Sequence, residues 1–202
     1  MSKVEIKRLK ASSKLEACEL VTQAFTDYPF AESYGLSPEA TPKIFQALID
    51  IIDFEHVWVY GIREDDRLVC ISISVGRLPA LAKVKLFLRF ILIFSRLLKW
   101  RMARFIWVMM AARPKHKGQP LEFMSFGTLP SYQKQGFGRE MLHFIYEEAK
   151  KEYYDGLNLW TARSRPAFFL YLKEGFQVEK EFTLFGGIPL CWMGKTLTDR
   201  VS

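Results

Sequence analysis

The spacing of apolar and polar positions changes repeatedly along the chain, and each spacing predicts one kind of element. Strands are expected where apolar positions alternate or where β-branched and aromatic residues run together. By this rule the predicted strands are 3–10, 57–64, 67–76, 121–129, 156–162, 176–185 and 188–197. Helices are expected where apolar positions recur every three or four residues. The predicted helices are 12–25, 37–54, 80–112, 138–153 and 165–174.

Turn residues support these boundaries. Pro29 ends the first helix, and the pairs at 65–66 and 186–187 each predict a hairpin between two strand-like runs. No internal repeat, low-complexity tract or linker interrupts the pattern. The sequence therefore predicts a single α/β domain over residues 1–202, with a mixed sheet and one helical insertion at 80–112.

Composition fits a folded protein without a metal. Half of the 202 residues are hydrophobic and 15% are aromatic, which allows a sizeable core and argues against disorder. The three cysteines are far apart and show no CxxC spacing, so neither a disulfide framework nor a zinc site is expected. The three histidines also lack the spacing of a metal site. We expect no metal and a reducing environment.

The N-terminal residues and the longest apolar run indicate where in the cell the protein is expected. The N-terminal residues lack the apolar core of a secretory signal. The longest apolar run, 84–100, is interrupted by four Lys or Arg residues and is shorter than the roughly 20 apolar residues that span a bilayer. The sequence therefore predicts a soluble, cytoplasmic protein.

Charge is distributed very unevenly. No Asp or Glu occurs from Arg67 to Pro120, whereas twelve Lys and Arg residues do, so that segment carries +12. Since the whole chain carries +7, the remaining residues carry −5. Such asymmetry indicates an anionic partner without identifying it. Nucleic acid is not expected, because no helix-turn-helix, zinc or RNA-recognition signature accompanies the charge.

A glycine-containing turn is the main candidate for chemistry. The stretch TLPSYQKQGFGREML, residues 128–142, places Gly136 and Gly138 between a predicted strand and a predicted helix. Backbone N–H groups at a helix start are unpaired and carry partial positive charge, and glycine lets a phosphate approach them. Lys134 and Arg139 add charge. By spacing alone, a tight turn that needs glycine for its geometry is an equally good explanation. The GxxxxGK[ST] and GxGxxG nucleotide-binding patterns are absent.

Two motifs favour a phosphate-binding role for this turn. The segment PSYQKQGFG resembles the acyl-CoA signature of the GNAT N-acetyltransferase superfamily, Q/R-x-x-G-x-G/A after a strand, through Gln133, Gly136 and Gly138. Downstream, SRPAFFLYLKEGF resembles the family's N-x-x-A-x-x-L-Y-x-x-x-G-F segment. The matching residues there are Ala167, Leu170, Tyr171, Gly175 and Phe176. Because both motifs occur in the family's order, the pair is far more specific than either alone. The resemblance is at motif level and covers 121–176.

The resemblance implies a fold and a donor. The fold would be a mixed, mostly antiparallel sheet flanked by helices, with the helical insertion between the third and fourth strands. The donor would be acetyl-CoA, its pyrophosphate on the backbone of 134–139 and its pantetheine beside 123–129, where the family's strands splay apart. The residues expected to bind it are Phe126, Thr128, Gln133, Lys134, Gln135, Gly136, Phe137, Gly138, Arg139, Ser164 and Ala167. Ser164 stands where the family has asparagine, so its reach is shorter.

The resemblance also implies catalytic residues. Tyr171 matches the family tyrosine near the CoA sulfur and is the expected general acid, since a phenol with a pKa of about 10 is protonated at neutral pH. The alternative is a core aromatic residue, because apolar residues surround it. Glu122 lies eleven residues before Gln133, an offset at which some relatives carry a catalytic glutamate. It is the candidate base, directly or through water; the alternative is a solvated glutamate.

Three interpretations of the insertion remain open. Four cations lie within a narrow arc of the predicted helix: Lys85, Arg89, Arg96 and Lys99. The insertion either covers the core with a solvated basic edge, or closes an acceptor pocket with its aromatic residues, or lies on a membrane surface. Its lack of acids disfavours a strongly cationic acceptor such as a polyamine, unless Asp27, Glu32 or Glu39 supplies carboxylates.

The predicted function is an N-acetyltransferase. It would move an acetyl group from acetyl-CoA to an amine of a small molecule or peptide, by direct attack in a ternary complex without a covalent enzyme intermediate. The alternative is a non-catalytic acyl-CoA-binding or peripheral-membrane module of the same fold. The sequence leaves open the acceptor, a homodimer and a weak contact of 80–110 with a membrane surface.

Overall fold

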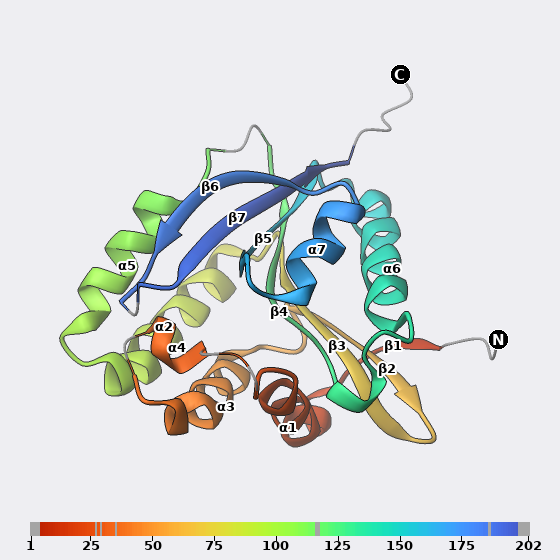
Figure 1. The fold of residues 1–202 in the computed structure, drawn as a ribbon, viewed down its shortest axis with the longest axis horizontal. Coiled ribbons are helices and arrows are strands. Elements are labelled where there is room, and N and C mark those ends of the chain that lie inside the picture. Colours follow the sequence, from red (N-terminus) through yellow and green to blue (C-terminus); the bar gives the residue numbers. More distant parts are fainter. Residues whose placement is uncertain are drawn as a thin grey trace.

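Seven strands form one sheet over the residues that the computed structural model describes, which are 5–26, 28, 30–34, 36–115, 118–185 and 187–197. The spatial order is β1-β2-β3-β4-β5-β7-β6, and helices cover both faces (Figure 1). The strands are β1 Ile6–Arg8, β2 Trp58–Glu64, β3 Arg67–Val75, β4 Leu121–Thr128, β5 Gly156–Ala162, β6 Gln177–Thr183 and β7 Pro189–Thr196.

The helices occupy the segments between these strands. The α-helices are α1 Lys14–Ala24, α2 Phe30–Ser33, α3 Thr41–Ile51, α4 Ala80–Leu98, α5 Arg101–Ala112, α6 Phe137–Lys151 and α7 Pro166–Lys173. Short 3-10 turns are η1 Ala11–Ser13, η2 Pro38–Ala40 and η3 Pro130–Tyr132. The insertion lies between the third and fourth strands, as predicted.

The strand pairings make the sheet mixed and mostly antiparallel, which confirms the predicted fold class. Neighbouring strands pair antiparallel except β4 and β5, which are parallel. That parallel pairing joins only Leu121 to Leu157 and Glu122 to Asn158, and beyond it the two strands diverge. On the other side of β4 the register with β3 shifts around Met124, which is an extra residue in the ladder.

The sheet separates two hydrophobic cores. One is built by α1 and α3 with the face of β2 and β3 that carries Val59 and Ile71. The other is built by α6 and α7 with β3, β4, β5 and β7, and contains Met141 and Ile145 of α6. This arrangement follows from sequence periodicity, because each of these helices has an apolar face that must be covered.

The helical insertion is a hairpin of two helices that buries only part of its apolar surface. The chain turns at Lys99, whose φ is 50°, so the predicted single helical segment becomes α4 and α5. Phe94 of α4 and Phe105 of α5 are buried in the first core. Large apolar side chains elsewhere on the hairpin are exposed: Leu81, Val84, Phe87, Leu88, Leu92, Trp100, Trp107 and Met110. A core-covering helix with a merely basic edge is therefore an incomplete description.

Other differences from the prediction are small. The first strand has three residues where 3–10 was predicted, and the second predicted helix begins with η2 before α3. Pro29 and Gly186 lie outside the described residues. Within the described part of the chain, none of the helices is long and apolar enough to cross a membrane.

Candidate functional site

A cavity of about 480 Å³, here called the outer cavity, lies where β4 ends, α6 begins and α7 begins. Its lining residues are Ala24, Phe126, Gly127, Thr128, Tyr132, Gln133, Lys134, Gly136, Phe137, Gly138, Arg139, Arg165, Pro166, Ala167, Phe169, Leu170 and Lys173. Nine of the residues predicted to bind the donor are among them. Residues of the two motifs, which are far apart in sequence, therefore line one cavity.

The turn from β4 to α6 is fixed by its own hydrogen bonds. Gln133 Nε2 donates to the carbonyl oxygen of Thr128 at 3.2 Å, and Gln135 Nε2 donates to that of Ser131 at 3.0 Å. Gln135 does not line the outer cavity. Both glutamine side chains thus hold the turn in shape, and Gln133 also contributes to the cavity wall.

The two glycines of the turn serve different purposes. Gly136 has φ +98°, a conformation that favours glycine, so its identity is explained by backbone geometry. Gly138 has no such requirement. A Cβ on Gly138 would lie 3.6 Å from Thr128 Oγ1 and 3.7 Å from Leu170 and Phe126, inside the cavity lining. Glycine at 138 therefore leaves this part of the cavity free of a side chain, whereas glycine at 136 is explained by backbone geometry.

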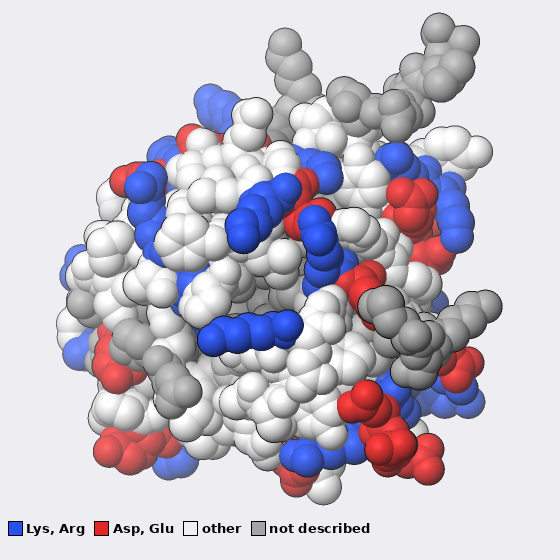
Figure 2. All heavy atoms as spheres, turned by 45° about the vertical axis from the view of Figure 1, so that its right-hand side comes forward, with Lys and Arg blue, Asp and Glu red and all other residues white. Residues whose placement is uncertain are grey.

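The outer cavity is electropositive. Over the part of the chain that the structure describes, its lining contains no acid and four cations: Lys134, Arg139, Arg165 and Lys173. A hollow bordered mainly by Lys and Arg side chains is visible in Figure 2 on the side of the molecule that carries α6 and α7. Arg139 is held by Glu174, with 2.6 Å between Nε and Oε1. The first intrahelical bond of α6 is from Glu140 N–H to Gly136 O, so the amides of 137–139 precede it and face the cavity end of the helix. Such a site suits a phosphate or pyrophosphate.

A smaller cavity of about 60 Å³, here called the inner cavity, is lined by residues of the diverging strands β4 and β5 and adjoins the outer one. The two share Phe126, Arg165 and Ala167. The other lining residues of the inner cavity are Phe25, Tyr28, Phe123, Met124, Ser125, Leu159, Trp160, Thr161, Ala162 and Tyr171. Four consecutive residues of β4, 123–126, line it. In a regular strand successive side chains point to opposite faces. The extra residue Met124 breaks this alternation, so all four can reach the same cavity.

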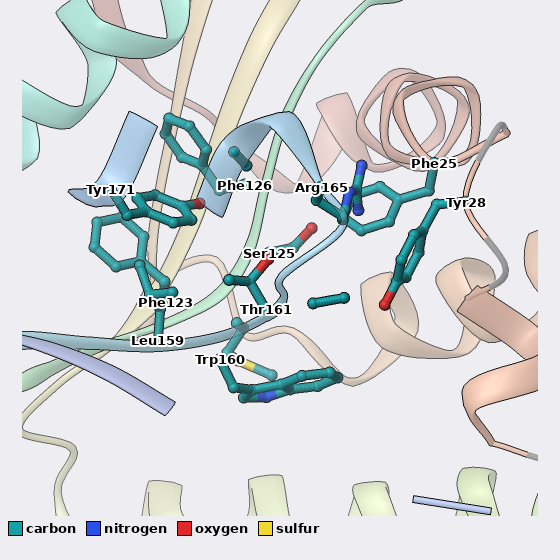
Figure 3. A pocket seen from close by; sticks show the side chains of 13 residues that line it. Phe25, Tyr28, Phe123, Ser125, Phe126, Leu159, Trp160, Thr161, Arg165 and Tyr171 are labelled. Carbon is teal, nitrogen blue, oxygen red and sulfur yellow. The ribbon is translucent and has the colours of Figure 1, made fainter. Parts of the chain in front are cut away.

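Tyr171 lies at the wall of the inner cavity (Figure 3). It is 5% exposed and packs against Phe126 and Phe176. Burial raises the pKa of its phenol above the ordinary value, and Arg165 opposes this only in part. The phenol therefore stays protonated over the physiological range, and it combines a core position with access to the cavity.

The backbone of β4 has unused hydrogen-bonding directions beside the inner cavity. Leu129 N–H donates to Val69 O on the β3 side at 3.0 Å. Because successive residues of a strand direct their amides to opposite sides, Thr128 and Phe126 direct theirs away from β3. On that side the pairing with β5 has ended after Glu122.

Glu122 and Ser164 stand apart from these cavities. Glu122 lies where β4 still pairs with β5, forms an ion pair with Arg113, and lines neither cavity. Ser164 is exposed in the turn before α7 and lines neither cavity, and the N-cap position of α7 is Arg165. Three carboxylates were considered as partners for a cationic acceptor. Glu32 and Glu39 line another cavity, which also includes Tyr28. Asp27 lies outside the described residues.

Sequence reasoning missed Arg165. Its Cζ lies 3.9 Å from the ring centre of Phe25 and 4.5 Å from that of Tyr28, and Nη2 donates to Ala24 O at 3.2 Å. Burial lowers the pKa of the guanidinium, and the neighbouring Tyr171 and Tyr28 oppose this. Arg165 lies within the second motif, but its partners Phe25 and Tyr28 are about 140 residues earlier, so no pattern in the sequence indicates their contact.

Three neighbouring side chains outside the two cavities are of the types that bind metal ions. Asp53, Glu55 and His56 offer ligand atoms within 4.8 Å of one another. Their contacts are local, since Asp53 Oδ1 accepts the N–H of Glu55 at 3.0 Å. These contacts explain the group as part of a loop.

Comparison with solved structures agrees with this architecture. A protein from Corynebacterium glutamicum, named histone acetyltransferase HPA2 and related acetyltransferase, has a TM-score of 0.68 at 17% identity, covering 98% of this chain and 99% of that one. PaiA N-acetyltransferase from Thermoplasma acidophilum, solved in complex with coenzyme A, has a TM-score of 0.61 at 14% identity, covering 96% and 99%.

A third structure carries the family name. It is from Desulfovibrio desulfuricans, is assigned to the GNAT acetyltransferase family, and has a TM-score of 0.61 at 16% identity, covering 97% of this chain and all of its own. No protein-family model and no curated protein matches the chain. At these identities the likeness establishes the fold. The chain has the fold of the GNAT acetyltransferases, as its two motifs predicted.

Proposed function

We propose that this protein is an acyl-CoA-dependent N-acyltransferase that transfers an acetyl group to an amine. One observation carries the proposal: the electropositive outer cavity at the start of α6 shares Phe126, Arg165 and Ala167 with the inner cavity, which is lined by Tyr171 and the diverging part of β4. The two cavities fit two parts of acetyl-CoA, the pyrophosphate and the thioester. The fold and the coenzyme A complex of the Thermoplasma protein support the same assignment.

The outer cavity would hold the donor. The amides at the start of α6 and the side chains of Lys134 and Arg139 would bind the pyrophosphate, and Gly138 leaves the space for it. Ala167 and Phe126 line both cavities and would contact the pantetheine arm. Gln133 would act by fixing the turn, and Gln135 and Ser164 would act at most from its edge.

The inner cavity would perform the transfer. The amine attacks the thioester carbon, a C–N bond forms, and the C–S bond breaks. The amides of Phe126 and Thr128 would stabilise the negative charge that develops on the carbonyl oxygen, and one such donor typically contributes about 3 kcal/mol. Tyr171 would donate the proton that the departing thiolate takes up. The proton released by the amine would pass through water to Glu122, since that carboxylate lines neither cavity.

Thermal unfolding with and without acetyl-CoA tests the binding step. A ligand that binds only the folded protein stabilises it by about 2.7 kcal/mol at a hundredfold excess over its dissociation constant. We expect a clear upward shift with acetyl-CoA and with free CoA. No shift at millimolar ligand would contradict the proposal. Release of free thiol in the presence of an amine panel then separates an enzyme from a module that binds acyl-CoA without turnover.

A further inference from the structure

Arg165 lines both cavities and is the one cation that the described residues contribute to the inner cavity. The guanidinium lies between the rings of Phe25 and Tyr28, and its one hydrogen bond to a described residue goes to the carbonyl oxygen of Ala24 (Figure 3). A guanidinium has five N–H donors. Among the residues described, no Asp or Glu lines the cavity, and none forms an ion pair with Arg165.

A second observation points to a ligand at the same place. Ser125 is 6% exposed, and its hydroxyl oxygen is buried with no hydrogen-bond partner among the described residues. Ser125 and Thr161 lie between Arg165 and Tyr171 in Figure 3. Buried polar groups and buried charges are ordinarily paired, because leaving them unpaired is unfavourable. An arginine and an unpartnered serine facing one small cavity therefore indicate a missing anionic or acceptor group.

We propose that this subsite binds a carboxylate of the acceptor, so that the enzyme acetylates an amine that also bears a carboxylate, as an amino acid does. The inference rests on the proposed acyltransferase function. Arginine and carboxylate form paired hydrogen bonds. Phe25, Tyr28 and Trp160 would contact an apolar substituent. A second cationic group on the acceptor would meet Arg165 and be disfavoured.

Matched acceptors test this directly. Turnover is measured with phenylalanine and phenylalaninamide, and with β-alanine and β-alaninamide, for the wild type and for Arg165→Met. Because acid and amide differ in amine basicity, the informative quantity is how their kcat/KM ratio changes between the two proteins. We expect the preference for the acid to fall by about tenfold or more in Arg165→Met, through KM for the acceptor. KM for acetyl-CoA should stay within about twofold.

Further variants guard against a purely structural effect. Arg165→Lys keeps the charge and should recover part of the preference, and Ser125→Ala should lower it severalfold with an unchanged unfolding temperature. Binding of the same acids and amides is also followed by thermal unfolding in the presence of CoA, which needs no turnover. An unchanged acid-to-amide ratio would overturn the inference, and so would a preference for diamines, which Glu32 and Glu39 beyond Tyr28 would favour.

The outcomes separate the two proposals. Turnover with amines regardless of a carboxylate leaves the acyltransferase function standing and removes only the carboxylate subsite. A rise in KM for acetyl-CoA in Arg165→Met would assign the arginine to the donor instead. Absence of both CoA binding and turnover would remove the proposed function itself.

A different surface carries a second inference. On α4, Leu81, Val84, Leu88 and Leu92 are all exposed and recur at helical spacing, so they form one outward stripe; Leu88 is 60% exposed. Beside it, three exposed cations follow the same helix: Lys85, Arg89 and Arg96. The opposite side of α4 is packed inward through Phe90 and Phe94, whose rings stack 4.6 Å apart.

We infer that this outer stripe of α4 docks onto a membrane surface containing anionic lipid. Charge complementarity selects this occupant, because residues 67–120 carry twelve cations and no acid. The same charge would repel a second copy of this segment. An apolar stripe flanked by Lys and Arg is typical of helices that lie in the interface plane. Trp100 and Trp107, which is 70% exposed, add the aromatic residues that favour that depth.

Vesicle flotation tests the docking. We expect the protein to float with vesicles of phosphatidylcholine and phosphatidylserine, to bind those of phosphatidylcholine alone much less, and to dissociate as salt rises. Replacing Lys85, Arg89 and Arg96 by Gln should weaken binding by on the order of a hundredfold, at about fivefold per cation. Leu88→Ser with Leu92→Ser should also weaken it. Failure to float at low salt, or a dimer abolished by the same leucine substitutions, would overturn the inference.

Discussion

The β4–α6 turn and the α4–α5 hairpin are both rich in Lys and Arg, yet the structure gives the two groups of cations different surroundings. In the turn they line a concave cavity together with backbone amides, without an acid in its lining. On the hairpin they flank apolar side chains that are exposed on a helix surface. A cavity lined by N–H groups suits a small phosphate-bearing ligand, whereas an exposed amphipathic face suits an extended anionic surface. Positive charge alone indicates an anion, and the shape around it indicates which one.

The sharpest test of the turn is Gly138→Leu. Its side chain would enter the outer cavity beside Thr128 and Leu170, so acetyl-CoA affinity should fall by on the order of a hundredfold. Isothermal titration measures this. Since Gly138 needs no unusual backbone angle and lies in the first turn of α6, the unfolding temperature should not fall. Unimpaired binding would mean that the donor does not lie there.

Tyr171→Phe tests the inner end of the same site. Loss of the phenol should lower kcat by about tenfold or more and leave the affinity for CoA unchanged. Burial raises the pKa of the Tyr171 phenol, so its protonated form persists as pH rises through the ordinary value of about 10. The wild-type rate should therefore climb with pH as the amine loses its proton, without a fall below about pH 10. A decline near neutral pH would assign the acid to another group.

Glu122→Gln should have a smaller effect. We expect kcat/KM to fall about tenfold at neutral pH, less than for a base in direct contact, because Glu122 is paired with Arg113 outside both cavities. The loss should shrink at high pH, where the amine is already neutral. A pH series of initial rates checks this, with Arg113→Gln as the matched control for the ion pair. No change at any pH would remove Glu122 from the mechanism.

Gly136→Ala separates geometry from ligand space within the turn. Because Gly136 has φ +98°, alanine there should reduce the free energy of unfolding by about 1–2 kcal/mol, whereas Gly138→Ala should not. Denaturant unfolding of the two variants measures the difference. Equal stability of both proteins would mean that the turn tolerates side chains in this conformation.

The smallest expected effects are those of changes in the α4–α5 hairpin on turnover and of changes in the β4–α6 turn on vesicle binding. Leu88→Ser with Leu92→Ser should leave turnover on a water-soluble acceptor within about twofold, since both side chains are exposed and line neither cavity. Gly138→Leu should in turn leave vesicle binding unchanged. A large loss of turnover in the leucine variant would indicate instead that the hairpin closes over the acceptor.

The sequence by itself determined much of the fold and one end of the site. The sequence pattern located β5 at 156–162 without error, and both faces of that strand are covered along its length. Gln133, Gly136 and Gly138 located the outer cavity, because a strand, a glycine turn and a helix start are local in sequence. The Gly175 stop of α7 was equally local, with φ +85°.

Only the tertiary structure decided what depends on distant partners. Arg165 becomes a half-buried cation because Phe25 and Tyr28, about 140 residues earlier, pack against it. The outer side of α4 stays exposed because its helix is apolar on more than one face and the core can cover just one of them. Spacing along a chain reports which residues share a face. Which face meets protein, ligand or solvent is set by packing between elements, which no local pattern contains.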